Sequence, residues 1–326
     1  MHAIRLHAFG PAANLRYEEV ADPRPGPGQA RIAVTVAGVH LIDTALRAGR
    51  PMGRLALPDL PMIPGREVAG VVDAVGPQVD EQWVGRRVVG HLGLASGGYA
   101  ELAVREAEAL HTVPDDLADD AAVAMIGTGR TALAILEVAA LTADDVVLVT
   151  AAAGGLGSLL VQAARNAGAT VVGVAGGPSK VQRVAQLGAT VAVDYAAPDW
   201  SDAVRAALGQ RAVTAALDGV GGALGRGALE LLGPGGRLIL FGFSSGAPTE
   251  LSAGDLFARG ITASAAIGAR MAQRPGGQRE LEEQALAAAA DGRLVPIVQR
   301  FALAQAVAAH EAIEGRATIG KTVLVP

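Results

Sequence analysis

One glycine-rich stretch of this chain could bind a dinucleotide. It runs from Val149 to Gln162 and reads "VTAAAGGLGSLLVQ". In dinucleotide-binding proteins, such a turn between a strand and a helix lets the backbone approach a pyrophosphate, and the helix N-terminus attracts its charge. Here the pattern is Ala152-x-Gly154-x-x-Gly157, with Gly155 and Leu156 inside it, so alanine replaces the first glycine. A β-branched run before the turn and an amphipathic pattern after it favour a cofactor loop over a turn that serves packing alone.

The segment after the next predicted strand bears on which dinucleotide is bound. Folds that bind NAD carry an Asp or Glu about 20 residues beyond the glycines, where it bonds the ribose hydroxyls. This chain has "VVGVAGGPSK" there, without an acid. Ser179 and Lys180 could instead bind a 2′-phosphate, which an acid would repel. The sequence therefore favours NADPH; the alternative is that Lys180 is a solvated helix lysine.

A histidine in the apolar stretch "AGVHLID", residues 37–43, could be a metal ligand, a proton-transfer group or a core histidine. The chain has no cysteine, and Arg66 in "PGREVAG" cannot ligate zinc, so His40, Glu67 and Asp43 are too few for a catalytic zinc site. We therefore expect no metal. Histidine can transfer a proton near neutral pH, so a catalytic role and a packing role both stay open for His40. His2, His7, His111 and His310 show no paired acid or ligand spacing, while His91 ends a probable strand that could face the cleft.

Composition excludes several classes of partner. A net charge of -5 and an aromatic content of 3% argue against a nucleic-acid partner. The absence of cysteine suits a reducing cytoplasm. Residues 146–164 carry no charge and approach the length of a membrane helix, but they read as strand, turn and helix, so we expect no membrane span.

The pattern of the chain changes near residue 120. Before it, short runs such as "ARIAVTVAGV" alternate between Pro- and Gly-rich turns, which predicts a compact, mostly β domain. After it, strands alternate with helical patterns, which predicts an α/β fold with a doubly wound parallel sheet. The length of 326 residues also favours two domains.

Several motifs together resemble one family. The glycine turn, "PGREVAGVVDAVG", "GGYAELAV" and the final "GKTVLVP" occur in the same order as in the zinc-free quinone oxidoreductases of the medium-chain dehydrogenase/reductase superfamily. The resemblance implies a GroES-like catalytic domain (residues 1–122 and 267–326) around a Rossmann domain (residues 123–266), with the active cleft between them. It also implies a homodimer formed largely through the cofactor domains.

The same resemblance assigns site residues. It implies 2′-phosphate contacts at Lys180, Tyr195 and Arg316, and places the pyrophosphate at Gly154 to Gly157. Thr128 matches a position near the nicotinamide, and Asp43 an orienting acid, while His40 stands where the family usually has asparagine. Strand ends should line the cofactor cleft at Gly219, Val220, Phe241 and Gly242.

A hydride donor without a metal works best on acceptors that are already electrophilic, such as quinones, enones or α,β-unsaturated thioesters. We therefore predict an NADPH-dependent quinone or enone reductase. Two alternatives stay open. One is an enoyl-thioester reductase, and the other is an NADPH-binding sensor or structural protein with little turnover.

Overall fold

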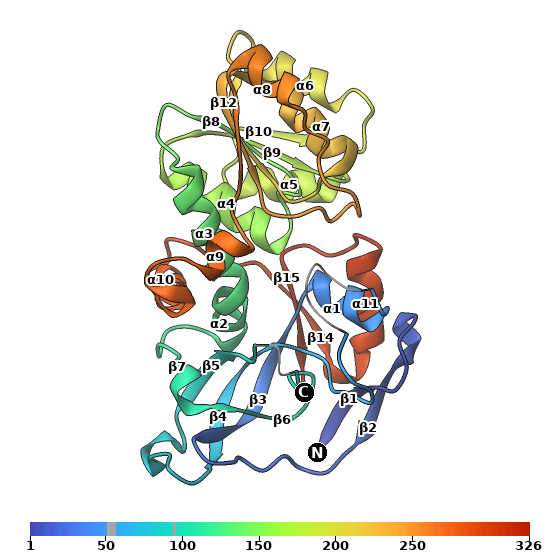
Figure 1. Cartoon of the computed structure of the whole chain (residues 1–326), viewed down its shortest axis with the longest axis vertical. Helices are drawn as coiled ribbons and strands as arrows, with labels where there is room; N and C mark the ends of the chain where they lie inside the picture. The colour runs from blue at the N-terminus through green and yellow to red at the C-terminus, as the bar shows by residue number, and fades with distance from the viewer. Residues whose placement is uncertain (51–56, 94–95) are drawn as a thin grey trace. The chain divides into compact units, whose positions relative to one another are not determined.

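A computed structural model describes residues 1–50, 57–93 and 96–326 (Figure 1). The chain forms two compact units. Unit 1 comprises Met1–Gly127 and Pro296–Pro326, and unit 2 comprises Thr128–Val295.

Unit 1 is built on a mostly antiparallel sheet with the order β14-β15-β3-β4-β5-β7, in which β6 also pairs with β3. The long central strand β3 (Gln29–Val39) begins with the alternating burial that its sequence predicts. The other strands are β4 (Glu67–Val75), β5 (Arg87–His91), β6 (Leu102–Glu106), β7 (His111–Thr112), β14 (Val298–Ala302) and β15 (Lys321–Val325). A separate hairpin joins β1 (His2–Leu6) and β2 (Leu15–Glu19).

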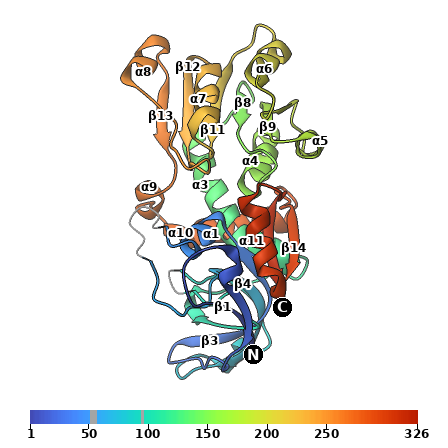
Figure 2. The same cartoon turned by 90° about the vertical axis from the view of Figure 1, so that its right-hand side faces the viewer.

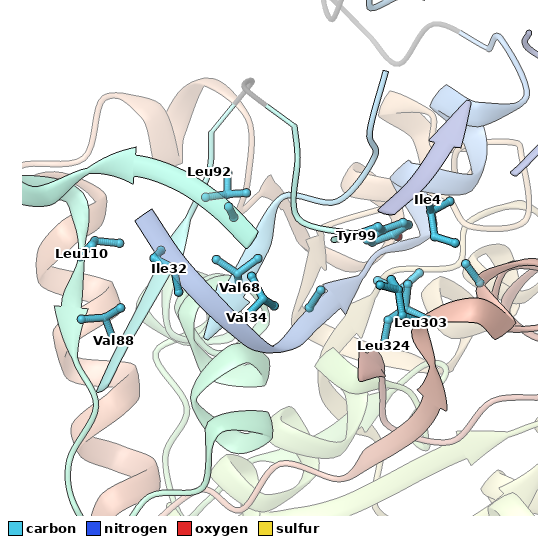
Figure 3. Close-up of a cluster of buried hydrophobic side chains, with 14 of the residues drawn as sticks. Ile4, Ile32, Val34, Val68, Val88, Leu92, Tyr99, Leu110, Leu303 and Leu324 are labelled. Atoms are coloured by element: carbon cyan, nitrogen blue, oxygen red, sulfur yellow. The ribbon is translucent and has the colours of Figure 1, made fainter. Parts of the chain in front are cut away.

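The helices of unit 1 are short. α1 (Leu41–Arg47) packs against α11 (Ala306–Glu314), and α2 (Asp119–Ala124) covers β3 and β4 (Figure 1). Single 3-10 turns are η1 (Ala12–Asn14), η2 (Glu81–Trp83), η3 (Ala107–Ala109) and η5 (Leu303–Gln305). The core joins both ends of the chain, since Ile4, Tyr99 and Leu324 belong to one buried cluster (Figure 3).

Unit 2 contains a six-stranded, fully parallel sheet with the order β10-β9-β8-β11-β12-β13. Figure 2 shows this order running from β13 and α8 at one edge towards β9 and α5 at the other. The strands are β8 (Val146–Val149), β9 (Thr170–Ala175), β10 (Val191–Asp194), β11 (Val213–Asp218), β12 (Leu232–Leu240) and β13 (Thr262–Ala265). All four residues of β8 are buried, as expected for a central strand covered on both faces.

Helices alternate with these strands, as the sequence predicts. They are α3 (Arg130–Ala139), α4 (Gly155–Asn166), α5 (Pro178–Gln186), α6 (Trp200–Leu208), α7 (Gly222–Leu231), α8 (Ala253–Arg259), α9 (Ala269–Ala272) and α10 (Gly277–Ala290). A π-helical turn, η4 (Met125–Gly129), precedes α3. The prediction of an α/β fold with a doubly wound parallel sheet and a mostly β GroES-like domain is confirmed.

The units divide at other residues than the predicted domains. The sequence suggested boundaries at 122/123 and 266/267, whereas the contacts divide the chain after Gly127 and after Val295. The difference at the second boundary comes from α10, which packs against α3 of unit 2. Arg130 on α3 and Glu282 on α10 form a salt bridge of 2.6 Å there.

The apolar stretch 146–164 forms strand, turn and helix, as its sequence suggests. Among the described residues, one continuous helical stretch, Asp119–Ala139, is long and apolar enough to cross a membrane. Its apolar part is 67% buried inside the protein, which is usual for a core helix.

Candidate functional site

The glycine turn lies between β8 and α4, where the carboxyl end of a central strand leads into a helix of 12 residues. Gly154 is the N-cap of α4, and its N–H donates to Ala151 O at 2.9 Å. A Cβ atom at Gly157 would lie 2.3 Å from Ala151 O, so only glycine fits there. Ala152, at the position of the missing glycine, donates its N–H to Val174 O at 3.0 Å, and the left-handed residue of the turn is Ala151 (φ 47°). The turn therefore keeps its form without the first glycine.

The carboxyl end of β9 brings the predicted 2′-phosphate residues of unit 2 together. Ser179 and Lys180 are in the first turn of α5, directly after Gly176 and Gly177. Tyr195 follows β10, and its ring packs against Gly176: a Cβ atom added at Gly176 would lie 3.1 Å from the nearest ring atoms. Two separate segments of the chain thus meet at one strand end, as ligand sites of parallel sheets require.

The structure adds an acid that the sequence pattern did not predict there. Asp194, the last residue of β10, pairs in register with Ala175 of β9. Its Oδ1 accepts hydrogen bonds from the N–H groups of Gly177 and Ala196, each at 2.9 Å, which lower the pKa of this carboxyl. The carboxylate therefore holds the turn that carries Ser179 and Lys180.

The other predicted cofactor-lining residues of unit 2 also gather at strand ends. Gly219 and Val220 follow β11, and Phe241 and Gly242 follow β12. A Cβ atom at Gly219 would lie 2.3 Å from the Phe241 ring, and one at Gly242 would lie 2.9 Å from Gly219 O. The buried Asp218 fixes this corner, because it accepts hydrogen bonds from Thr150 at 2.8 Å and Thr249 at 2.7 Å.

Two predicted residues do not belong to these strand ends. Thr128 is buried in the π-helical turn η4, at the start of unit 2. Arg316 belongs to unit 1, where it takes a left-handed conformation (φ 56°) after α11. The structure does not bring Arg316 to Lys180 within one unit, so its phosphate contact stays a prediction.

In unit 1, three polar side chains from distant parts of the chain form what we call the His40 cluster: His40, Glu67 and Lys321. His40 Nε2 lies 2.7 Å from Glu67 Oε2, and Lys321 Nζ lies 2.8 Å from each of these two atoms. The Glu67 and Lys321 side chains are 0% and 4% exposed, while that of His40 is 23% exposed. Only His40 can therefore reach a ligand.

Two glycines make room for the Glu67 carboxylate. A Cβ atom at Gly127 would lie 1.6 Å from Oε1, and one at Gly38 would lie 2.4 Å from Oε2. Burial alone would raise the pKa of Glu67, but the positive charges of His40 and Lys321 outweigh burial and hold this pKa well below its usual range. Glu67 is thus a buried carboxylate at neutral pH.

Asp43 positions the loop that carries His40. It is buried in the first turn of α1, where Oδ2 accepts from the His40 N–H at 2.8 Å and from the Tyr99 hydroxyl at 3.1 Å. Burial, then the charge of Asp43, raise the pKa of Tyr99 well above its usual value, so the hydroxyl stays a donor. His310 Nε2 lies 3.3 Å from the same hydroxyl, and burial lowers the pKa of His310 to about 4. His310 is therefore a neutral, packed histidine at pH 7.

No metal centre forms around these groups. Within residues 1–50, 57–93 and 96–326, no three His, Asp or Glu side chains are close enough to hold a metal ion. The Lys321 ammonium lies 2.8 Å from both His40 Nε2 and Glu67 Oε2, as a fixed cation that already neutralises the carboxylate.

Sequence reasoning missed Lys321, although it stands in the quoted motif "GKTVLVP". For Glu67 the sequence suggests only a role as a metal ligand. The available signal was an isolated lysine at the start of an otherwise apolar terminal strand, because a buried lysine needs an anionic partner.

Comparisons with known proteins identify the family to which the chain belongs. Residues 26–115 match the family model of the alcohol dehydrogenase GroES-like domain, and residues 155–291 match that of zinc-binding dehydrogenases. The chain is 34% identical to a 2-haloacrylate reductase of Burkholderia sp, over 99% of this chain and 98% of the relative. It is 31% identical to a quinone oxidoreductase of Pseudomonas aeruginosa, over 99% of both. The structure of Escherichia coli quinone oxidoreductase complexed with NADPH covers 100% of both chains, with a TM-score of 0.87 and 27% identity.

Proposed function

Because this chain belongs to the zinc-free quinone oxidoreductases of the medium-chain dehydrogenase/reductase superfamily, we propose that it reduces quinones or α,β-unsaturated carbonyl compounds with NADPH. The observation that carries the proposal is the glycine turn at the start of α4, beside the strand end that bears Ser179 and Lys180. When bound, the nicotinamide supplies a hydride. We also propose that the protein is cytoplasmic, because a sequence without cysteine and a reducing cofactor both suit that compartment.

The residues of unit 2 fit such a cofactor. The N–H groups at the start of α4 suit a pyrophosphate, since Gly154, Gly155, Leu156 and Gly157 offer backbone donors at a helix N-terminus. Ser179, Lys180 and Tyr195 suit the 2′-phosphate. The rest of the cofactor suits Thr128 and the corner at the strand ends, which is formed by Gly219, Val220, Phe241 and Gly242.

We assign to His40 the contact with the carbonyl oxygen of the acceptor. Conjugate reduction places negative charge on the carbonyl oxygen, and a hydrogen bond or proton from a nearby side chain stabilises that charge. The His40 side chain is partly exposed and is fixed by buried neighbours, while Asp43 holds its backbone N–H. The acrylate named in the Burkholderia relative is itself an α,β-unsaturated compound, which supports an acceptor of this class.

The proposal is tested by following NADPH oxidation with quinones, 2-enals and enoyl thioesters in parallel, with NADH as a control. We expect turnover with quinones or 2-enals and a preference for NADPH. Faster turnover of enoyl thioesters than of free acceptors would favour an enoyl-thioester reductase. Tight NADPH binding without turnover of any acceptor would identify a sensor or structural protein instead.

Replacing Lys180 by alanine should raise the KM for NADPH by about tenfold or more and leave the KM for NADH unchanged, because a charge-assisted hydrogen bond to phosphate contributes about 1.5–3 kcal/mol. The control is Arg205→Ala, which removes an exposed cation from α6 of the same unit. Steady-state kinetics with both cofactors measure the effect. An equal loss with NADPH and NADH would remove Lys180 from the phosphate site.

We also propose that the protein is a homodimer joined through unit 2. Strand β13 is one of the two edge strands of the parallel sheet, and an edge strand can pair with another chain. Next to it in the sequence, α8 carries Phe257, whose exposed fraction is 88%. An interface with two-fold symmetry would bury the Phe257 ring of each of the two copies.

Replacing Phe257 by aspartate should therefore weaken self-association about tenfold or more, since burial of one phenylalanine contributes about 1.5–3 kcal/mol. Sedimentation velocity over a range of protein concentrations measures the change. Val84→Asp, at an exposed apolar residue of unit 1, is the matched control. A wild-type monomer, or a Phe257 variant that associates like the wild type, would contradict this interface.

A further inference from the structure

The His40 cluster poses a problem of hydrogen-bond roles. Glu67 is ionised, so its Oε2 can only accept, and a lysine ammonium can only donate. His40 Nε2 lies within hydrogen-bond distance of both, 2.7 Å from Oε2 and 2.8 Å from Nζ. This nitrogen has one in-plane position, which holds either a proton or a lone pair. It can therefore donate to Glu67 or accept from Lys321, but not both at once.

These two options are different protonation states of His40. With a proton on Nε2, the ring donates to the carboxylate, and Lys321 donates to the same Oε2 at 2.8 Å. With a lone pair on Nε2, the ring accepts from Lys321, and the ring proton is on Nδ1. The contact to the carboxylate joins opposite charges when the ring is protonated, which favours the first option.

The other ring nitrogen, Nδ1, is not the atom that Glu67 and Lys321 contact. In the described part of the chain, the His40 side chain makes no cap hydrogen bond to the first turn of α1, and it is 23% exposed. Gly127 borders the ring without offering a side chain, since a Cβ atom there would lie 3.6 Å from His40 Cε1. Nδ1 is thus the ring atom left to contact a ligand.

This inference rests on the proposed function. We propose that Glu67 and Lys321 are positioning residues, which hold His40 by Nε2 and make Nδ1 the atom that transfers a proton to the reduced acceptor. In this step the Nδ1–H bond of the imidazolium breaks, and the proton passes to the acceptor anion. Nε2 keeps its proton on Glu67, the ring becomes neutral, and solvent restores the Nδ1 proton afterwards.

Glu67 and Lys321 have opposite effects on the protonated form of His40. The carboxylate stabilises the imidazolium, and the ammonium weakens that effect by neutralising the carboxylate. The other titratable or charged groups around the cluster are His91 on β5, opposite Glu67 in the sheet, Asp43 on α1, and Arg66, 3.6 Å from Asp43. None of these contacts Nε2, so the two buried partners set its state.

The pH dependence of kcat provides a first test. Because the protonated ring is the proposed acid, the rate should fall as pH rises. Lys321→Met should move the midpoint of this fall in kcat upward by about one pH unit, and Glu67→Gln should move it downward by a similar amount, since one unit corresponds to a tenfold change. Arg300→Gln, which removes an exposed cation from β14, should leave the midpoint unchanged.

Nitrogen NMR of the protein labelled with ¹⁵N-histidine provides a test that does not need turnover. The chain has 6 histidines, and His40→Asn identifies the signal of His40. We expect the neutral ring to carry its proton on Nε2 in the wild type and in Lys321→Met, and on Nδ1 in Glu67→Gln, where Lys321 becomes the stronger partner. If Lys321→Met does not fold, Lys321→Arg replaces it and should keep the wild-type midpoint, because it keeps the charge.

Shifts in opposite directions together with the change of tautomer would establish the positioning role. A neutral ring protonated on Nδ1 in the wild type, or equal shifts in both variants, would overturn it. If the wild type reduces no acceptor while Glu67→Gln still changes the tautomer of His40, the proposed function is wrong but the positions of Glu67 and Lys321 are as described. Full activity of His40→Asn with an unchanged pH profile would also overturn the inference but would leave the reductase function intact.

Discussion

Replacing Glu67 by leucine should lower the free energy of unfolding by about 3–5 kcal/mol, because the change leaves the buried Lys321 ammonium without its anion. Lys321 lies among buried strands and has no other carboxylate within salt-bridge distance in the described part of the chain. Replacing both residues, as Glu67→Leu with Lys321→Met, should recover most of the loss, since a well-packed apolar pair needs no compensating charge. The double variant should therefore be more stable than either single variant.

Urea unfolding measures this difference. The chain has two tryptophans, Trp83 in unit 1 and Trp200 in unit 2, so a Trp200→Phe background makes the fluorescence report on unit 1. Arg300→Gln, at an exposed ion pair of the same sheet, should change stability by less than about 1 kcal/mol. A Glu67→Leu variant as stable as this control, or a double variant no better than the single one, would show that the pair is not the buried charge pair described.

Replacing Gly157 by alanine should weaken NADPH binding about 100-fold or more, because displacing a binding turn by about 1 Å has effects of this size. The new Cβ atom would lie 2.3 Å from Ala151 O and 2.8 Å from Ala152 Cα, both of which are backbone atoms. The turn or the start of α4 must therefore move away from the pyrophosphate position.

Isothermal titration calorimetry measures the affinity, and a melting curve shows whether the variant is folded. Gly254→Ala is the matched control, since its Cβ atom would meet only Ser252 Oγ at 3.5 Å on the exposed helix α8. We expect the control to bind NADPH like the wild type. Wild-type affinity of a folded Gly157→Ala variant would remove the turn from the cofactor site.

The glycine turn could be predicted because its information is local. The strand, the turn and the helix lie within 21 residues of sequence, Val146 to Asn166, and each has a composition typical of its structure. The replacement of the first glycine by Ala152 could not be judged from sequence. The structure explains it, since Ala151 takes the left-handed conformation instead.

The His40 cluster could not be predicted because sheet register, and not local sequence, brings its members together. Lys321 is separated from His40 by 281 positions and reaches it because β15 pairs with β3 so that Thr322 faces Val39. Glu67 reaches it because β4 pairs with β3 so that Val68 faces Ala37. Such register follows from which faces are buried in the folded sheet.

Asp194 shows the same limit in the cofactor unit. The segment directly after β9 contains no acid, whereas the parallel pairing of Ala175 with Asp194 brings an acid from β10 to the same strand end. The second domain boundary also depended on a distant contact, the packing of α10 on α3.

The proposed reaction delivers a hydride to the conjugated carbon of the acceptor without a metal. It is tested most directly with NADPH deuterated at the transferred position, a 2-enal as acceptor and a chelator in the buffer. We expect turnover and a saturated aldehyde that carries deuterium on the carbon β to the carbonyl. Deuterium on the carbonyl carbon of an allylic alcohol, or activity that is lost with the chelator and restored by zinc, would contradict this reaction.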